Sequence, residues 1–184
     1  EVMKKIIIPT IQGMEAEGRT YTGVLYAGLI LTSSGPKVLE YNCRFGDPET
    51  QVQMLRLEDD LAEVLLKVAR GNLGDTKLNW KKEAAACVVM SVQGYPHEFP
   101  KGQEVIIDPI EDESVVVFHA GTVKKGAQIV NMAGRVVNVC AGGASLSEAL
   151  KKAYAAVPKV RYEGATFRHD IGYRPLDHLA AASR

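Results

Sequence analysis

One ten-residue stretch, 40–49 (Glu-Tyr-Asn-Cys-Arg-Phe-Gly-Asp-Pro-Glu), constrains this chain more than any other. The residues just before it, 37–39, have the composition of a β-strand, and side chains along a strand alternate between its two faces. Glu40, Asn42 and Arg44 are therefore expected on one face. The alternate positions are expected to form an ordinary core face: Leu39, Tyr41 and Cys43. Because an apolar core does not accept unpaired polar groups, the polar face must meet solvent or bind a ligand.

The polar face carries two kinds of chemical group. Glu40 and Asn42 offer a carboxylate and an amide oxygen, which are hard ligands suited to Mg²⁺, an ion that also keeps phosphates and water in its shell. Arg44 cannot ligate a metal, but its planar guanidinium suits bidentate binding of a carboxylate or phosphate. The row predicts two metal ligands followed by an anion clamp. From the alternation alone, an exposed strand with a solvated polar face is an equally good interpretation.

The end of the stretch favours ligand binding. Asp47 is a good N-cap, Pro48 suits the first helical position, and Glu49 lies in a first turn, where the helix dipole favours negative charge. The polar strand therefore runs through a tight turn at Gly46 into a helix start, and free N–H groups at such a start attract anions. Simple helix capping explains the same residues, and both interpretations can hold together.

Periodicity and turn residues predict the remaining elements. Apolar residues at helical spacing predict a helix that ends at Gly18, and a hairpin follows from residue 22 to the strand that carries Glu40. Helices are expected to begin at Pro48 and near Asp60, and at the capping box 145–148. Strands or strand-like segments are expected near 84–92, 104–107, 114–120, 128–132, 135–140 and 167–173. Because residues 84–92 are apolar at both odd and even positions, this strand is expected to be buried on both faces.

Composition is that of a globular chain and excludes few functions. The hydrophobic fraction is 46%, and 22 Lys plus Arg balance 22 Asp plus Glu, so charge gives no reason to expect nucleic-acid or membrane partners. No apolar run approaches the about 20 residues that span a bilayer. Three widely spaced cysteines (Cys43, Cys87 and Cys140) predict reduced, buried thiols in a reducing compartment, which indicates the cytoplasm or an organelle.

The stretch 40–49 resembles the signature of the phosphoribosylamine–glycine ligase family, also called glycinamide ribonucleotide synthetases, in the ATP-grasp superfamily. Further segments are similar to that family's motifs in the same order: 21–29, 88–90, 94–96, 117–122, 134–136 and 170–172. The resemblance covers nearly the whole chain, and it is specific because several motifs agree in order and spacing.

The resemblance implies an α+β fold. Residues 1–80 are expected to form the second half of an ATP-grasp domain. Residues 81–176 are expected to form a small, mainly antiparallel β-rich C-terminal domain with one or two helices, and 177–184 a frayed tail. The implied reaction is ATP-dependent ligation of glycine to 5-phosphoribosylamine in purine biosynthesis, through a glycyl phosphate, with release of ADP and phosphate.

The resemblance also assigns roles to residues. It implies that Glu40 and Asn42 bind Mg²⁺ or Mn²⁺, and that Arg44 is catalytic and binds substrate. Substrate-side or loop-shaping roles are expected for Gly46, Asp47 and Glu49. Many ATP-grasp relatives place a further acid on the preceding strand, but positions 24–31 contain no carboxylate. The metal is therefore expected to depend on nucleotide phosphates and water.

Part of the family's enzyme has no counterpart in this chain, which resembles only its carboxyl-terminal part. Neither G-x-x-x-x-G-K-[ST] nor G-x-G-x-x-G occurs. We expect a piece of a longer polypeptide, inactive in isolation. Its partners would be the amino-terminal part of the same enzyme and the small molecules ATP, glycine and 5-phosphoribosylamine. Two alternatives stay open: a non-catalytic structural or interaction module, and a different ATP-grasp ligase or carboxylase.

Overall fold

The computed structural model describes residues 1–182, which form two compact units. The first unit comprises Glu1–Glu49 and Glu58–Asn79, and the second comprises Thr50–Leu57 together with the chain from Trp80 onward. The segment 50–57 thus belongs to the second unit, although it precedes part of the first in the sequence.

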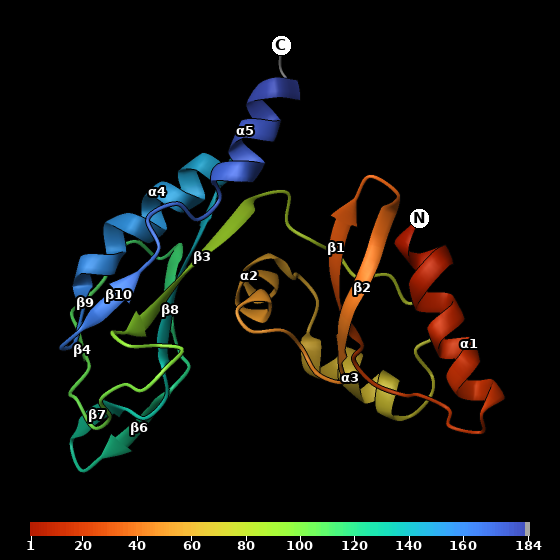
Figure 1. Ribbon diagram of the computed structural model, residues 1–184, viewed down its shortest axis with the longest axis horizontal. Helices are drawn as coiled ribbons and strands as arrows, with labels where there is room; N and C mark the ends of the chain where they lie inside the picture. Colours follow the sequence, from red (N-terminus) through yellow and green to blue (C-terminus); the bar gives the residue numbers. More distant parts are fainter. Residues whose placement is uncertain (183–184) are drawn as a thin grey trace. The chain divides into compact units, whose positions relative to one another are not determined.

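The first unit begins with a helix and a hairpin (Figure 1). A π-helical turn, η1 (Met3–Ile7), continues into α1 (Ile8–Ala16). Strands β1 (Tyr26–Thr32) and β2 (Gly35–Asn42) pair antiparallel, and Gly35 has a φ of +100°, which only glycine adopts readily in such a tight turn. The helix and the hairpin that the sequence predicts here are confirmed.

Helix α3 (Leu61–Ala69) has the ends that its flanking residues predict. The side chain of Asp60 accepts hydrogen bonds from the backbone N–H groups of Ala62 and Glu63, at 2.8 and 3.3 Å. Gly71 follows the last turn with a φ of +67°, as in a glycine C-cap. Local capping chemistry therefore fixes this helix between residues 60 and 71.

One face of the hairpin is not the core face that alternation predicts. Leu39 is 68% exposed, Tyr41 is 40% exposed, and Cys43 is exposed as well. The pairing register shifts between Gly28 and Leu29, which makes Leu39 the extra residue of a β-bulge and interrupts the alternation. A sheet of only two strands also has too few neighbours to bury both faces. The expected burial of these three side chains was wrong.

The second unit contains a four-stranded antiparallel sheet in the order β10-β3-β8-β5. Its strands are β3 (Ala84–Val92), β5 (Val115–His119), β8 (Arg135–Gly143) and β10 (Ala165–Phe167). Two short antiparallel pairs accompany it: β4 (Ile106–Ile107) with β9 (Val160–Arg161), and β6 (Thr122–Lys125) with β7 (Gln128–Asn131). Every strand pair in residues 1–182 is antiparallel, and helices accompany these sheets, in agreement with the α+β class.

Three helices belong to this unit. The first is α2 (Glu49–Arg56), whose residue Glu49 still belongs to the first unit. The others are α4 (Leu146–Ala156), which continues into the 3₁₀ turn η2 (Val157–Lys159), and α5 (Tyr173–Ala182). The expected tail, 177–184, therefore contains the second half of α5, and positions 183 and 184 lie outside the described residues. In residues 1–182, no helix is both long and apolar enough to cross a membrane.

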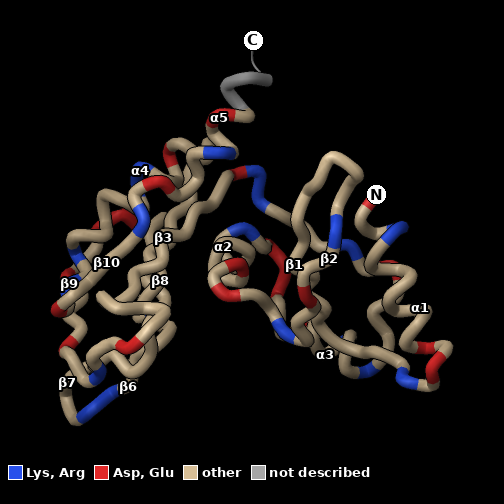
Figure 2. Tube along the Cα trace, in the orientation of Figure 1, with Lys and Arg blue, Asp and Glu red and all other residues tan. Residues whose placement is uncertain are grey.

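Helix α4 covers one face of the four-stranded sheet (Figure 1). On that face β3 contributes Val88 and Met90, which are at most 1% exposed and belong to one core with Ala153 of α4. The alternate positions Cys87 and Val89 are only half-buried, so the burial of both faces expected for 84–92 was wrong. Figure 2 shows the trace of β3 free of charged residues, in keeping with its central place in the sheet.

The three cysteines lie in three different environments. Cys43 is exposed, Cys87 is half-buried and Cys140 is buried, and none of the three forms a disulfide bond. The prediction of buried thiols therefore holds for Cys140 alone. Cys43 departs from it because it follows β2 on the hairpin that leaves its apolar face open.

Candidate functional site

Glu40 and Asn42 lie side by side near the end of β2. The Asn42 side-chain amide donates a hydrogen bond of 3.0 Å to Glu40 Oε1. Both residues pair with the neighbouring strand, Glu40 opposite Gly28 and Asn42 opposite Tyr26. The hairpin thus holds two oxygen-bearing side chains together, as their spacing in the sequence predicts.

Arg44 does not continue that row. Strand β2 ends at Asn42, and Arg44 lies in the bend that follows, where its guanidinium donates a 2.8 Å hydrogen bond to the carbonyl oxygen of Phe45. The expectation that Arg44 shares a strand face with Glu40 was therefore wrong, because the alternation stops two residues earlier. The guanidinium is exposed and remains within the same short loop.

Gly28 provides the room that the Glu40 side chain uses. A β-carbon built on Gly28 would lie 3.0 Å from Glu40 Cγ, tighter than an ordinary contact. The sequence shows that β1 carries no acidic residue. It does not reveal the close approach of Glu40 to Gly28, because that depends on the pairing register of β1 with β2. The signal that could have found it is a glycine inside an otherwise apolar strand, a position typical of close approach.

Glu49 and Gly46 form a second small cluster with Tyr26. The Tyr26 hydroxyl donates a 2.7 Å hydrogen bond to Glu49 Oε1, and this bond is the main cause of a raised Tyr26 pKa. Gly46 is buried, and a β-carbon there would collide with the Glu49 carboxylate and come within 3.0 Å of the Tyr26 ring. Sequence reasoning singled out Gly46 and Glu49 but missed Tyr26, which holds them together.

Helix α2 begins at Glu49, one residue later than expected. Asp47 and Pro48 form the turn before it, so Glu49, and not Pro48, occupies the first helical position. A carboxylate in the first turn still complements the helix dipole. Asp47 thus lies in the connection between the strand that carries Glu40 and the helix that begins at Glu49.

The donor set fits a hard divalent cation. Glu40 offers two carboxylate oxygens, and rotation of the Asn42 amide would present its Oδ1 beside them in place of the nitrogen that now donates to Glu40. Among the described residues, no group of three or more His, Cys, Asp or Glu side chains is arranged to hold a metal ion. A cation here would therefore take two protein ligands and complete its shell from phosphate and water.

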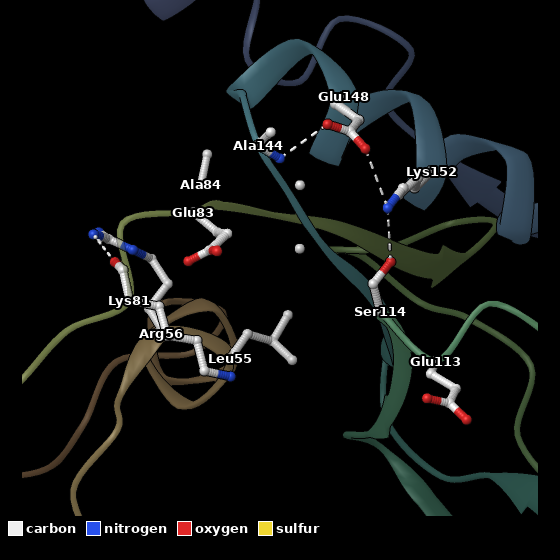
Figure 3. A pocket seen from close by; sticks show the side chains of 12 residues that line it. Leu55, Arg56, Lys81, Glu83, Ala84, Glu113, Ser114, Ala144, Glu148 and Lys152 are labelled. Carbon is white, nitrogen blue, oxygen red and sulfur yellow. Dashed lines mark hydrogen bonds and ion pairs between the residues drawn. The ribbon is translucent and has the colours of Figure 1, made fainter.

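The second unit contains a cavity of about 500 Å³ that borders α2, α4 and the ends of β3 and β8 (Figure 3). Two of its charged side chains, Glu148 and Lys152, bind one another. Glu148 accepts a hydrogen bond from the backbone of Ala144 at 2.9 Å, the main cause of its lowered pKa, and forms an ion pair with Lys152 at 3.3 Å. Lys152 also donates to Ser114 at 3.1 Å. These contacts support the start of α4.

Comparison with known proteins matches both parts of the chain to one family. Residues 1–50 match the family model described as "Phosphoribosylglycinamide synthetase, ATP-grasp (A) domain". Residues 85–174 match the model described as "Phosphoribosylglycinamide synthetase, C domain". The two models follow one another in the order in which the resemblance places these domains.

Curated relatives agree with those models over nearly the whole chain. The phosphoribosylamine–glycine ligase of Caulobacter vibrioides is 49% identical over 180 residues, which cover 96% of this chain and 42% of the relative. The chloroplastic phosphoribosylamine–glycine ligase of Arabidopsis thaliana is 45% identical, covering 100% of this chain and 36% of the relative. The chain thus spans about two-fifths of the length of these relatives.

Solved structures show the same relation in three dimensions. The phosphoribosylamine–glycine ligase of Thermotoga maritima superimposes with a TM-score of 0.78 at 35% identity, covering 91% of this chain and 41% of that protein. The biotin carboxylase subunit of a pyruvate carboxylase superimposes with a TM-score of 0.58 at 16% identity, which shows a shared fold alone. Both support the prediction of a partial ATP-grasp fold followed by a β-rich domain.

Proposed function

The chain belongs to the phosphoribosylglycinamide synthetase family, and on that premise we propose that it is the carboxyl-terminal part of a ligase that joins glycine to 5-phosphoribosylamine. The reaction consumes ATP, passes through a glycyl phosphate, and releases ADP and phosphate. The polypeptide that carries it would also contain an amino-terminal part, since this chain spans 42% of the Caulobacter relative. The isolated chain is expected to be inactive.

The observation that carries the proposal is the hairpin end, where Glu40 and Asn42 are held together at 3.0 Å inside a segment that matches the ATP-grasp model. Both side chains offer hard oxygen donors. A strand that only faces solvent would not need a glycine, Gly28, directly opposite Glu40. A ligand site does benefit, because the missing β-carbon leaves space for the Glu40 side chain.

We assign Glu40 and Asn42 as the ligands of Mg²⁺ or Mn²⁺. When bound, the cation would neutralise phosphate charge during phosphoryl transfer. The protein's own contribution is to hold its two donors at alternate positions of one strand, so that little ordering is needed when nucleotide arrives. Tyr26, opposite Asn42, fixes the neighbouring loop through its bond to Glu49.

Arg44, Gly46, Asp47 and Glu49 form the substrate side of the proposed site. The exposed Arg44 guanidinium can exchange its bond to the Phe45 carbonyl for a stronger, charge-assisted pair with the glycine carboxylate. Gly46 keeps the loop close to Glu49 and Tyr26. We propose that this loop orients the carboxylate for attack on ATP, without any covalent intermediate on the protein.

The direct test is ADP release by the complete polypeptide. We expect ADP release that requires both glycine and 5-phosphoribosylamine, formed in the assay from ribose 5-phosphate and ammonia. ADP release that instead requires bicarbonate would identify a carboxylase and overturn the proposal. The 184-residue chain, assayed alone, is expected to release no ADP above background, and activity from it would contradict the need for the amino-terminal part.

A further inference from the structure

Tyr26 is connected to both ends of the loop 43–48. It is the first residue of β1 and lies opposite Asn42, the last residue of β2, from which the loop departs. Its hydroxyl donates a 2.7 Å hydrogen bond to Oε1 of Glu49, the first residue of α2, at which the loop ends. One residue that precedes the loop by many positions in the sequence therefore closes it, with its backbone at one end and its side chain at the other.

The Glu49 carboxylate is turned toward the loop. Its Oε1 accepts from Tyr26, and its Oε2 lies so close to Gly46 that a β-carbon built on Gly46 would collide with it. The same β-carbon would come within 3.0 Å of the Tyr26 ring. Gly46 is buried, so carboxylate and ring both lie against the loop backbone at this point. The contacts of the Glu49 carboxylate are thus with the loop itself.

The charged side chains of the proposed site act on the Tyr26 hydroxyl. The bond to Glu49 is the main cause of its raised pKa, burial adds to the rise, and the negative charges of Glu49 and Glu40 act in the same direction. The positive charge of Arg44 acts in the opposite direction. A tyrosine with a raised pKa stays protonated at neutral pH, so its hydroxyl can always donate to Glu49. These interactions place Tyr26 near both the metal donor Glu40 and the guanidinium of the loop.

The loop has little else to fix its shape. Of its residues only Gly46 is buried, while Cys43 and Arg44 are exposed. The Arg44 guanidinium bonds to the carbonyl of its neighbour Phe45, a contact that would be given up when a carboxylate ligand binds. A hydrogen bond from a hydroxyl to a carboxylate is stronger than one between neutral groups. The bond between Tyr26 and Glu49 is therefore a main restraint on where this loop carries its arginine.

We propose that Tyr26 is a positioning residue for glycine, because its bond to Glu49 holds the loop 43–48 in the arrangement from which Arg44 reaches the glycine carboxylate. The inference rests on the proposed function, in which Arg44 binds that carboxylate. It divides the roles within the loop: Arg44 contacts the substrate, while Tyr26 and Glu49 act through the loop. Loss of the bond should weaken glycine binding and leave the binding of nucleotide and metal at Glu40 unchanged.

The test is steady-state kinetics of Tyr26→Phe in the complete polypeptide. This change removes one hydroxyl and keeps the ring and the backbone pairing with Asn42. We expect the KM for glycine to rise about tenfold, as for the loss of one hydrogen bond to a charged group. The KM for ATP and the Mn²⁺ concentration for half-maximal ADP release should stay within about twofold of the wild type. A general structural defect would instead lower the amount of active enzyme or alter all three constants together.

Glu49 offers a second way to break the same bond. Glu49→Gln keeps an oxygen that can accept from Tyr26, so it should raise the KM for glycine less than Glu49→Ala does. Adding Tyr26→Phe to Glu49→Ala should have no further effect, since both changes remove one interaction. Tyr41→Phe is the matched control, because the Tyr41 hydroxyl in the same hairpin is also hydrogen-bonded, to Thr10 of α1 at 2.7 Å. It should leave all three constants unchanged.

An unchanged KM for glycine in Tyr26→Phe would overturn the positioning role, as would an equal rise in Tyr41→Phe. Hydrogen–deuterium exchange of the amides of residues 43–47 provides a measurement that needs no activity, and we expect it to be faster in Tyr26→Phe alone. If the wild type shows glycine-dependent ADP release and Tyr26→Phe changes neither measurement, the positioning role is refuted and the ligase function stands. If no glycine-dependent ADP release is found but exchange rises, the assignment to glycine falls with the proposed function, and the restraint on the loop stands.

Discussion

Gly28 and Glu40 face each other across the hairpin, and a β-carbon built on Gly28 would lie 3.0 Å from Glu40 Cγ. Gly28→Ala should therefore turn the Glu40 side chain without unfolding the hairpin. Metal binding commonly weakens when the groups that orient a metal ligand are disturbed. In the complete polypeptide, we therefore expect the Mn²⁺ concentration for half-maximal ADP release to rise about tenfold. The matched control is Gly13→Ala in α1, where an added β-carbon has open space. An unchanged Mn²⁺ dependence in Gly28→Ala would contradict this role.

Glu40→Gln and Asn42→Ala should lower turnover far more than stability. Glu40 is exposed and Asn42 is only half-buried, so their loss removes little burial, whereas the proposed site loses a donor. We expect a fall in turnover of at least about a hundredfold, with a stability change within about 0.5 kcal/mol. Glu15→Gln, at an exposed position of α1, is the control for loss of a charge. Equal effects on turnover and stability would instead indicate a structural role.

Ser145→Ala should destabilise the second unit by about 1 kcal/mol, because Ser145 Oγ accepts from the backbone of Glu148 at the start of α4. The fluorescence of Trp80, the chain's single tryptophan and part of this unit, provides the unfolding signal in a urea titration. Ser147→Ala, two residues further on at an exposed helix position, should be neutral or slightly stabilising.

The same cap predicts a dependence on acid. The Ala144 N–H, and then Lys152, lower the pKa of Glu148, so its contribution to stability is present above the unfolded pKa of about 4.5. That contribution should disappear as pH falls below this value through the lowered pKa. Glu148→Gln should therefore flatten the loss of stability as pH falls below about 4.5. If the free energy of unfolding of Glu148→Gln falls with pH as steeply as that of the wild type, the ionisation of Glu148 does not contribute to stability.

Tyr162 predicts a loss of stability in alkali. Burial raises its pKa above the ordinary value, while its hydroxyl donates to the Ser91 carbonyl at 3.0 Å. The unfolded chain ionises this tyrosine near pH 10, whereas the folded chain keeps it neutral, so its stabilising effect should decline as pH rises above about 10. Tyr162→Phe should cost about 1 kcal/mol at neutral pH and reduce the alkaline decline. Tyr173→Phe, which alters an exposed tyrosine, should do neither.

Local chemistry made part of this fold predictable. The limits of α3 and α4 follow from Asp60, Gly71 and Ser145, whose capping roles depend on neighbours within a few residues. The hairpin was predictable for the same reason, because its two apolar runs are joined by a short turn. The adjacency of Glu40 and Asn42 followed from strand periodicity alone.

Features that depend on register or on distant strands could not be read from the sequence. Alternation cannot show that Leu39 is the extra residue of a bulge, nor that β2 ends before Arg44, so the exposure of Leu39 and the separate position of Arg44 were missed. The alignment of Thr166 with Ser91 and of Ser91 with Arg135 depends on non-local pairing of β10, β3 and β8. Tyr26 was missed because its contact with Glu49 joins two different elements.

The pairing of β10 with β3 has a consequence for how the second unit folds during synthesis. Ala165 lies opposite Val92, so the strand made last in this sheet flanks the strand made first. The ribosome must therefore have synthesised all residues between β3 and β10, including α4, before β10 can pair with the edge of β3. Until then β3 keeps one side unsatisfied, and this unit should reach its protease-resistant state abruptly, late in synthesis, instead of strand by strand.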